Sequence, residues 1–492
     1  MKRLLLLICI MFLLTGSLFA EEPAPPQGEA EGLALTLKEA VRIALGENLA
    51  LKRSALDVES ARADILVNEG EFDPALSANL LYSYEKRQSV SALVSPEDKE
   101  LIYDLSLGGK LRTGTEYTLD WTNRRVKTNL VFIEEEFRPY YASELKLNLS
   151  HPLLKGRGRE VQEALINAAE RAAESALLID RRRAEEIVLD AGSAYWELLY
   201  RIVELDVARL SFKFAEAILD ETRQKIEVGT LAPVEIYEVE AEVYSRREAI
   251  INAEKALKDA NDTLKRILNL ADWTRDIVPT DEPPPPDAEF HEPALSDVLQ
   301  KRADYKAALE DIRNREILER FYKNQALPEL DLLAGAGLNA ARGKWDETYS
   351  DLVSTDYYSW EVGLGVTIPI NNRTARGTYR KARYETDKAK IAARELEQGI
   401  LYELREARRA AEASRQSIEA SASRRVASQR RFEAERERFR VGLAVLNDVF
   451  RLEVDYNQAV SDENRARANY AIALMRLDQV SGRLLESYAG LS

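Results

Sequence analysis

The 492-residue chain has little of the chemistry that metal and cofactor sites require. It contains one cysteine and two histidines, which cannot supply a zinc cluster, a disulfide framework or a histidine-ligated metal site. Its 69 lysines and arginines are outnumbered by 84 aspartates and glutamates, which gives a formal net charge of -15. A surface that binds nucleic acid needs clustered cations. We therefore expect no metal, no cofactor and no nucleic-acid partner.

The mature chain also lacks an apolar run long enough to cross a bilayer as a helix. The apolar run Leu4–Leu14 follows Lys2 and Arg3 and precedes the small residue Ala20, a pattern typical of a cleavable signal peptide over residues 1–20. Cleavage there would remove the cysteine and two cations, which changes the net charge to -17. We expect an exported protein that, if it enters a membrane, does so with strands.

No pattern in the sequence indicates an enzyme. Neither His151 nor His291 has a nearby serine–acid or thiol constellation. The segment Gly335–Ala340 follows a predicted strand and fits a dinucleotide-binding fingerprint, but no regular helix pattern follows it. We expect no catalytic residues.

Four landmarks of the chain occur twice in the same order, which predicts an internal duplication. The period is near 200 residues, too long for a solenoid repeat. The paired landmarks are Lys52 and Lys306, Pro74 and Pro328, Pro152 and Pro369, and Gly229 and Gly442. We expect a first repeat over 21–280 and a second over 294–492, joined by a proline-rich linker over 281–293 that acts as an extended spacer.

Each repeat is expected to contain a short and a medium helix, a block of strands and a long helical stretch broken once at glycine. In the first repeat these span about 36–70, 75–150 and 158–270; in the second they span about 294–325, 329–369 and 373–485. The strand blocks alternate apolar and polar residues, with one apolar face. This period fits a soluble sandwich as readily as a lipid-facing barrel, and the strands alone favour the sandwich.

The two long helical stretches argue against the soluble sandwich. Residues 158–227 and 373–440 contain no proline, and about 70 residues could extend about 105 Å as one helix. Apolar or small residues recur in each stretch with a period near 3.5. Many of them are alanine or serine, so each helix buries little area and needs neighbours on both sides. A secreted coiled-coil scaffold would explain the heptads but gives no role to six strands.

Six short segments occur in a fixed order within this duplicated strand-and-helix plan. They are Leu35–Leu45 with Asn48, Leu149–Leu154, Ala194–Leu198, Val228–Thr230, Trp360–Leu364 and Val441–Leu443. In this combination and order, the chain resembles the TolC-like outer-membrane efflux proteins over nearly all of its mature length.

The resemblance implies an α+β membrane protein. Three copies would close one outer-membrane β-barrel, continued by a long periplasmic α-helical barrel. Closure across chains removes the free strand edges that lipid does not tolerate. Such a duct conducts passively, and it would work with a periplasmic adaptor (membrane fusion) protein and an inner-membrane pump. A secreted scaffold and an autonomous diffusion porin remain the alternatives.

The resemblance also implies where the duct is gated. The two helix breaks, Val228-Gly229-Thr230 and Val441-Gly442-Leu443, would form the hairpin turns that dock the adaptor. Asp448 matches an aspartate that forms a carboxylate ring in gated relatives, and Glu235 holds the corresponding place in the first repeat. The second acidic position falls on Arg451, so an Asp448–Arg451 pair is the hypothesis here. Phe439 stands where some relatives have a tyrosine that hydrogen-bonds to a neighbouring helix.

The first strand block is 37 residues longer than the second and contains an extra predicted hairpin. It runs from Leu105 to Trp121 around the turn Arg112-Thr113-Gly114. Relatives usually contribute four strands per chain, which gives twelve in the barrel; six strands per chain would allow eighteen. The alternative is that the hairpin extends an extracellular loop. We favour twelve slightly.

Overall fold

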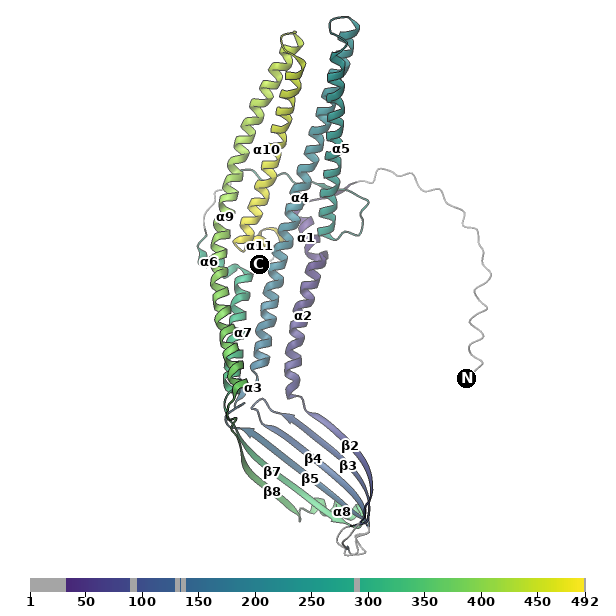
Figure 1. Ribbon diagram of the computed structural model, residues 1–492, viewed down its shortest axis with the longest axis vertical. Helices are drawn as coiled ribbons and strands as arrows, with labels where there is room; N and C mark the ends of the chain where they lie inside the picture. Colours follow the sequence, from purple (N-terminus) through teal and green to yellow (C-terminus); the bar gives the residue numbers. More distant parts are fainter. Residues whose placement is uncertain (1–31, 89–94, 129–132, 134–138, 287–292, 491–492) are drawn as a thin grey trace, which may run out of the picture.

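The computed structural model describes residues 32–88, 95–128, 133, 139–286 and 293–490. Long helices form an elongated bundle, and one large sheet continues from one end of it (Figure 1). The predicted signal peptide lies outside the described residues. The elements are β1 (Leu33–Leu35), α1 (Leu37–Glu47), α2 (Leu49–Glu69), η1 (Gly70–Phe72), β2 (Ala75–Lys86), β3 (Glu97–Lys110), β4 (Glu116–Thr128), β5 (Tyr140–Pro152), α3 (Arg159–Gln162), α4 (Ala164–Glu227), α5 (Glu235–Leu268), β6 (Ile277–Pro279), α6 (Leu295–Lys301), α7 (Ala303–Gln325), β7 (Glu329–Arg342), α8 (Trp345–Ser354), β8 (Tyr358–Thr367), α9 (Arg373–Arg440), α10 (Leu446–Val480) and α11 (Leu484–Ala489).

The expected order of helices, strands and long helices occurs twice. Helices α4 and α9 have 64 and 68 residues, so they extend about 96 and 102 Å at about 1.5 Å per residue. The predicted seam is confirmed: Ile187, Ala191 and Leu198 of α4 are buried, as are Ile400 and Leu404 of α9. The seam faces neighbouring helices, because such small side chains stabilise a helix only when it is packed on several sides.

Local signals explain where the first helix begins. The Thr36 side chain accepts a hydrogen bond from the Glu39 backbone, and the Glu39 carboxylate accepts one from the Thr36 backbone. This reciprocal pair is a capping box, which satisfies two donors that a helix start leaves open. Ala40, Val41 and Ala44 then fall on one face and are fully buried in the largest apolar cluster.

The strands form one six-stranded antiparallel sheet in the order β2-β3-β4-β5-β7-β8. The extra hairpin, β3 and β4, lies inside this sheet between β2 and β5 and is paired over its length. The interpretation of this hairpin as a loop extension is therefore wrong, as is the preference for four strands per chain. The reason is that its apolar alternation runs in register with both neighbouring strands, so it adds to their face.

The register divides the sheet into an apolar and a polar face, because residues directly opposite in antiparallel strands share a face. On the apolar face, side chains such as Leu80, Leu105 and Trp360 are exposed. The residues of the apolar face include Leu76, Ala78, Leu80 and Tyr82 of β2, Leu101, Tyr103, Leu105 and Leu107 of β3, Leu119 and Trp121 of β4, Leu145, Leu147 and Leu149 of β5, Leu332, Ala334, Ala336 and Leu338 of β7, and Trp360, Val362, Leu364 and Val366 of β8. Helix α8 covers part of this face, since Trp345 packs on Tyr103 and Tyr349 packs on Trp121. The remaining exposed apolar side chains require an apolar environment or a partner.

The glycines of the dinucleotide-like segment have a packing role. A Cβ at Gly335 would lie 2.8 Å from Oε1 of Glu361, and one at Gly337 would lie 3.0 Å from Oγ of Ser359. Bare glycine backbone on β7 leaves room for the ion pair of 3.0 Å between Lys146 on β5 and Glu361 on β8, which reaches across the polar face. Helix α8 follows β7 and was not predicted from the sequence. It packs on β7 and β5 near the end of the sheet that is far from the bundle (Figure 1).

The ends of the first repeat are tied together in the bundle. Strands β1 and β6 pair in parallel, and the Tyr195 hydroxyl donates to the Asp281 carboxylate at 2.8 Å. The linker therefore starts from an anchored residue. Its residues 287–292 lie outside the described part of the chain.

Among the described residues, no helix has both the length and the hydropathy that a membrane-crossing helix needs. Within the same ranges, no group of three or more His, Cys, Asp or Glu side chains is arranged to hold a metal ion.

Candidate functional site

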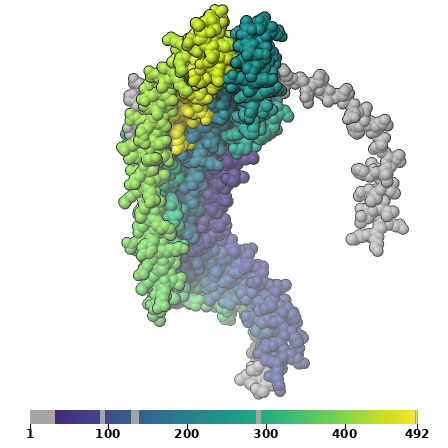
Figure 2. Space-filling view, turned by 45° about the horizontal axis from the view of Figure 1, so that its top comes forward, coloured from purple at the N-terminus to yellow at the C-terminus, as the bar shows by residue number. Residues whose placement is uncertain are grey.

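The two helical hairpins, α4–α5 and α9–α10, end side by side at the end of the bundle opposite the sheet (Figures 1 and 2). Both turns have the same backbone geometry. The Gly229 amide donates to the Ile226 carbonyl and the Thr230 amide donates to the Lys225 carbonyl. Each of these bonds has an equivalent in the second hairpin, from Gly442 to Phe439 and from Leu443 to Arg438. This is a Schellman motif, which closes a helix through a left-handed residue.

Glycine is required in both turns by backbone conformation and not by crowding. Gly229 and Gly442 have φ of 75° and 78°, and nothing lies within 4 Å of a Cβ placed on either. The residues beside them are exposed although apolar: Val228 is 74% exposed and Leu443 is 70% exposed. Exposed apolar side chains gathered at one end of a molecule are typical of a surface that contacts another protein.

Three of the predicted gate residues, Glu235, Asp448 and Arg451, lie just beyond these turns. Glu235 begins α5, and Asp448 lies in the first turn of α10, where a carboxylate interacts favourably with the helix dipole. The Arg451 guanidinium donates to the Asp448 carboxylate at 2.9 Å, so the hypothesised pair is present within the chain. In the described part of the chain, no hydrogen bond or ion pair joins Asp448 to the first hairpin.

Phe439 contacts the first hairpin instead. The Lys225 ammonium lies 4.6 Å from the centre of its ring, which is a cation–π contact between α4 and α9. Phe439 also packs on a small apolar cluster to which α4, α5 and α10 contribute. The buried members of this cluster are Ala215, Ile218, Leu219, Val239, Leu446 and Phe450. Phe439 therefore links the hairpins through its ring, by the cation–π contact with Lys225 and by packing on the apolar cluster.

A buried ion pair further from the turns joins the hairpins, and sequence reasoning missed it. Arg246 of α5 lies 3.1 Å from the Glu453 carboxylate of α10, and their side chains are only 11% and 4% exposed. Burial raises the pKa of Glu453 above its ordinary value, although the Ser211 hydroxyl and Arg246 oppose this shift. The two residues are over 200 positions apart, so no sequence spacing could indicate their contact.

The polar face of the sheet is strongly acidic. Within the strand bounds it carries ten carboxylates and three basic side chains. The carboxylates are those of Glu85, Asp98, Glu100, Asp104, Glu116, Asp120, Glu144, Glu329, Asp331 and Glu361, and the basic side chains are those of Lys110, Arg124 and Lys146. This face would attract cations and repel anions.

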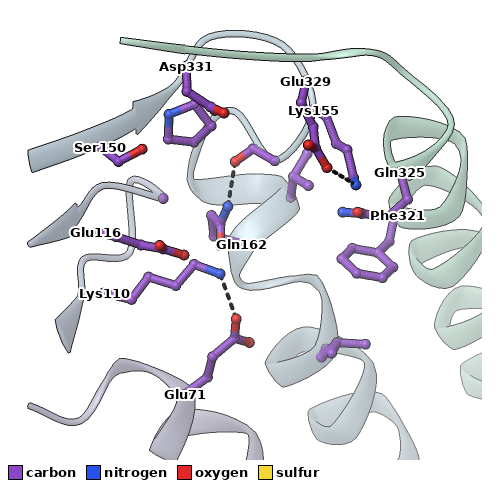
Figure 3. A pocket seen from close by; sticks show the side chains of 15 residues that line it. Glu71, Lys110, Glu116, Ser150, Lys155, Gln162, Phe321, Gln325, Glu329 and Asp331 are labelled. Carbon is purple, nitrogen blue, oxygen red and sulfur yellow. Dashed lines mark hydrogen bonds and ion pairs between the residues drawn. The ribbon is translucent and has the colours of Figure 1, made fainter. Parts of the chain in front are cut away.

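A cavity of about 380 Å³ lies where the sheet meets the helices (Figure 3). Two ion pairs of 2.6 Å lie in its lining, between Lys110 and Glu71 and between Lys155 and Glu329. Glu116 and Asp331 also line it, and neither has an ion-pair partner among the described residues. The cavity therefore carries more carboxylates than ammonium groups.

Comparison with known proteins gives a consistent result. The family model described as "Outer membrane efflux protein" matches residues 40–270 and 294–483. The outer membrane protein TolC of Escherichia coli strain K12 is 24% identical over 317 residues, which are 61% of this chain and 62% of TolC. This chain thus matches less than two thirds of that relative's length.

Several solved structures share the fold. A membrane protein from Pseudomonas aeruginosa matches with a TM-score of 0.68 and 18% identity, over 91% of this chain and 93% of that one. The outer membrane channel CmeC of Campylobacter jejuni matches with a TM-score of 0.64 and 18% identity, over 91% and 86% of the two chains. CusC matches with a TM-score of 0.69 and 14% identity, over 96% and 99%.

Proposed function

This chain belongs to the outer membrane efflux protein family, and on that basis we propose that it is the outer-membrane exit duct of a tripartite efflux or type I secretion system. The family is one of transport channels, not of enzymes. The observation that carries the proposal is a two-faced sheet that continues directly into helical hairpins whose longer helices, α4 and α9, are about 100 Å long. Such a chain has both a surface for lipid and a path across the periplasm.

The sheet supports assembly as a homotrimer in the outer membrane. The isolated chain leaves β2 and β8 as unpaired edges, which a bilayer does not tolerate. Strand β2 runs away from the bundle and β8 runs towards it, so β8 of one copy can pair antiparallel with β2 of the next. Three six-stranded sheets would close a barrel of about eighteen strands, wider than one of twelve.

The two faces of the sheet support one orientation of it in this barrel. The apolar face would contact lipid, and the acidic face would line the lumen, because a charged side chain facing lipid is costly. The helices would then extend into the periplasm, with the turns at Gly229 and Gly442 furthest from the membrane. The exposed apolar residues at these turns supply the surface for a periplasmic adaptor, which in turn connects the duct to an inner-membrane pump.

The gate is assigned to the same end of the molecule. In a trimer, three copies of Asp448 near one axis would repel one another, and Arg451 lowers that repulsion by pairing within each chain. We expect Asp448→Ala to increase the fraction of time in which purified channels in a planar bilayer are open, by several-fold at rest. The reason is that Arg451 then loses its partner and repels its copies.

The control for this variant is Glu437→Ala. Glu437 forms a similarly exposed pair with Arg440, three residues away near the turn of the second hairpin, and its loss should leave the resting current unchanged. Equal currents for wild type and Asp448→Ala would reject the gate assignment alone. Absence of any current would reject the duct and favour a secreted scaffold. A large current that is open at rest in the wild type would favour a diffusion porin.

The acidic lumen predicts cation preference. Double substitution Glu116→Gln and Asp331→Asn should lower the ratio of cation to anion permeability by about twofold, because it removes two carboxylates per chain from the mouth of the barrel. The measurement is the reversal potential in a salt gradient. Asp346→Asn with Glu347→Gln makes the same change of charge on α8, outside the lumen. An equal shift in both variants would contradict the assignment of the lumen face.

A further inference from the structure

The apolar face of the sheet carries charge only at the end furthest from the helices. Its charged residues within the strand bounds are Lys86, Glu97, Lys99, Arg125, Lys127 and Arg342. Five of these six are cations, although the polar face of the same sheet is strongly acidic. We call Lys86, Lys99, Arg125 and Lys127 the cationic rim.

The cationic rim begins where the apolar band ends. On β3, Lys99 lies eight residues beyond Leu107, which is about 26 Å along the strand at about 3.3 Å per residue. Strands of a barrel tilt by about 35–45°, so this length corresponds to about 20 Å of height, and the long lysine and arginine side chains reach beyond it. A barrel presents an apolar band about 25 Å tall to the hydrocarbon core. The cationic rim would therefore lie at the level of the lipid headgroups, in the leaflet furthest from the periplasm.

Two cations of the rim are placed against each other. Lys99 and Lys127 are directly opposite in the pairing of β3 and β4, an arrangement that is destabilising for like charges. The neighbouring Arg125 lies two residues from Lys127 on the same face. Such a cluster is stabilised when an anion bridges its members.

Among the described residues, little compensating charge lies beside the cationic rim. Glu97 pairs with Lys99 at 3.1 Å, but no carboxylate of the described residues forms an ion pair with Arg125 or Lys127. Of the acids on the nearby helix α8, Asp351 pairs with Arg342 and Glu347 pairs with Lys344. These carboxylates are thus engaged with other cations.

Two cations of the rim lie beside tyrosine rings. The Lys99 ammonium lies 5.2 Å from the centre of the Tyr84 ring, and the Arg125 guanidinium lies 5.8 Å from that of Tyr141. Tyr141 in turn packs edge-on against Trp345 of α8, with 5.9 Å between ring centres. Aromatic residues beside cations are characteristic of the membrane interface, where one end of the side chain meets lipid and the other meets water.

We propose that the cationic rim binds the phosphate groups of lipid headgroups in the outer leaflet. The ligand is a phosphate-bearing lipid because the cations adjoin a lipid-facing surface and because phosphate oxygens accept several hydrogen bonds from lysine and arginine. The proposal rests on the proposed function, since it needs the apolar face to be in contact with lipid. The rim thereby anchors the barrel at a fixed depth.

The test uses purified full-length protein in a neutral detergent, titrated with bisphosphorylated lipid A and followed by its thermal unfolding. Lipid A should stabilise the wild type, and Arg125→Gln with Lys127→Gln should weaken binding about 30-fold, at about 1 kcal/mol per cation. The matched control is Lys110→Gln with Arg124→Gln, which removes two cations from the polar face and should bind lipid A as the wild type does.

Three outcomes would overturn the proposal. They are equal affinity of the rim variant and the wild type, equal stabilisation by lipid A without its phosphates, and full displacement of lipid A by millimolar inorganic phosphate. The last would identify a site for free phosphate. Channel recordings of the same variants distinguish failure of this proposal from failure of the proposed function. A rim variant that conducts like the wild type but binds lipid A more weakly supports the lipid-binding proposal. A wild-type protein that does not conduct contradicts the proposed function as a duct.

Discussion

Replacement of Arg246 by leucine is expected to reduce the free energy of unfolding by about 3–5 kcal/mol, because it leaves the Glu453 carboxylate buried without its partner. Replacement of both residues by leucine should recover most of this loss, since the double variant buries no charge. Unfolding in urea, followed by the helical circular dichroism signal of the detergent-solubilised protein, measures both effects.

The same pair gives a functional expectation. Arg246 and Glu453 join the first hairpin to the second below the turns, so breaking the pair should loosen the hairpins and raise the resting current. The control is Arg209→Leu, which breaks an ion pair of 3.4 Å with Glu254 between two helices of one hairpin. Those side chains are about half exposed, and the expected cost is below about 1 kcal/mol. Equal costs for the two single variants would show that the burial of Arg246 has no energetic importance.

Replacement of Arg302 by alanine is expected to be similarly costly, about 3–5 kcal/mol. This guanidinium is 1% exposed and donates to Asp304 at 2.5 Å and to Glu403 at 2.8 Å. Burial alone would raise the pKa of Asp304, but the hydrogen bond and charge of Arg302 hold it below its ordinary value. Without Arg302, two carboxylates that link α7 to α9 lose their common partner.

This loss would appear as a lower midpoint of urea unfolding, with an unchanged slope of the free energy of unfolding against urea concentration. Arg315→Ala is the matched control because Arg315 lies on α7, the helix that Arg302 directly precedes, and pairs with Asp311, with both side chains more than a third exposed. Its expected effect is below about 1 kcal/mol. A cost for Arg302→Ala no larger than that of the control would show that the buried guanidinium does not hold these helices together.

Much of the fold could be predicted because its signals are local. Positions such as Ile187, Leu198 and Ile400 repeat with the period of a packed helix, and they are buried. The alternation of the strands placed all six of them, and glycine marked both turns at 229 and 442. These features depend on residues within a few positions of one another, so one sequence is sufficient to find them.

The features that sequence reasoning missed depend on contacts between distant segments. The Arg246–Glu453 pair joins residues of different repeats, and neither residue stands out among the many charges of its helix. The membership of β3 and β4 in the sheet depends on their pairing with β2 and β5, which alternation alone does not specify. Helix α8 follows the glycines of β7 too closely for its short pattern of ten residues to be separated from a loop.

Because β2 and β8 are unpaired edges, each copy in the proposed trimer needs both of its neighbours. In the proposed trimer no chain can complete its own hydrogen bonding in lipid, so insertion depends steeply on the local concentration of partners. One chain with a damaged edge strand would prevent closure of the barrel that it forms with two intact chains. In an equal mixture of intact and damaged copies, only about one trimer in eight would contain three intact chains. A mutation that damages an edge strand would therefore act dominantly over the intact copy of the gene.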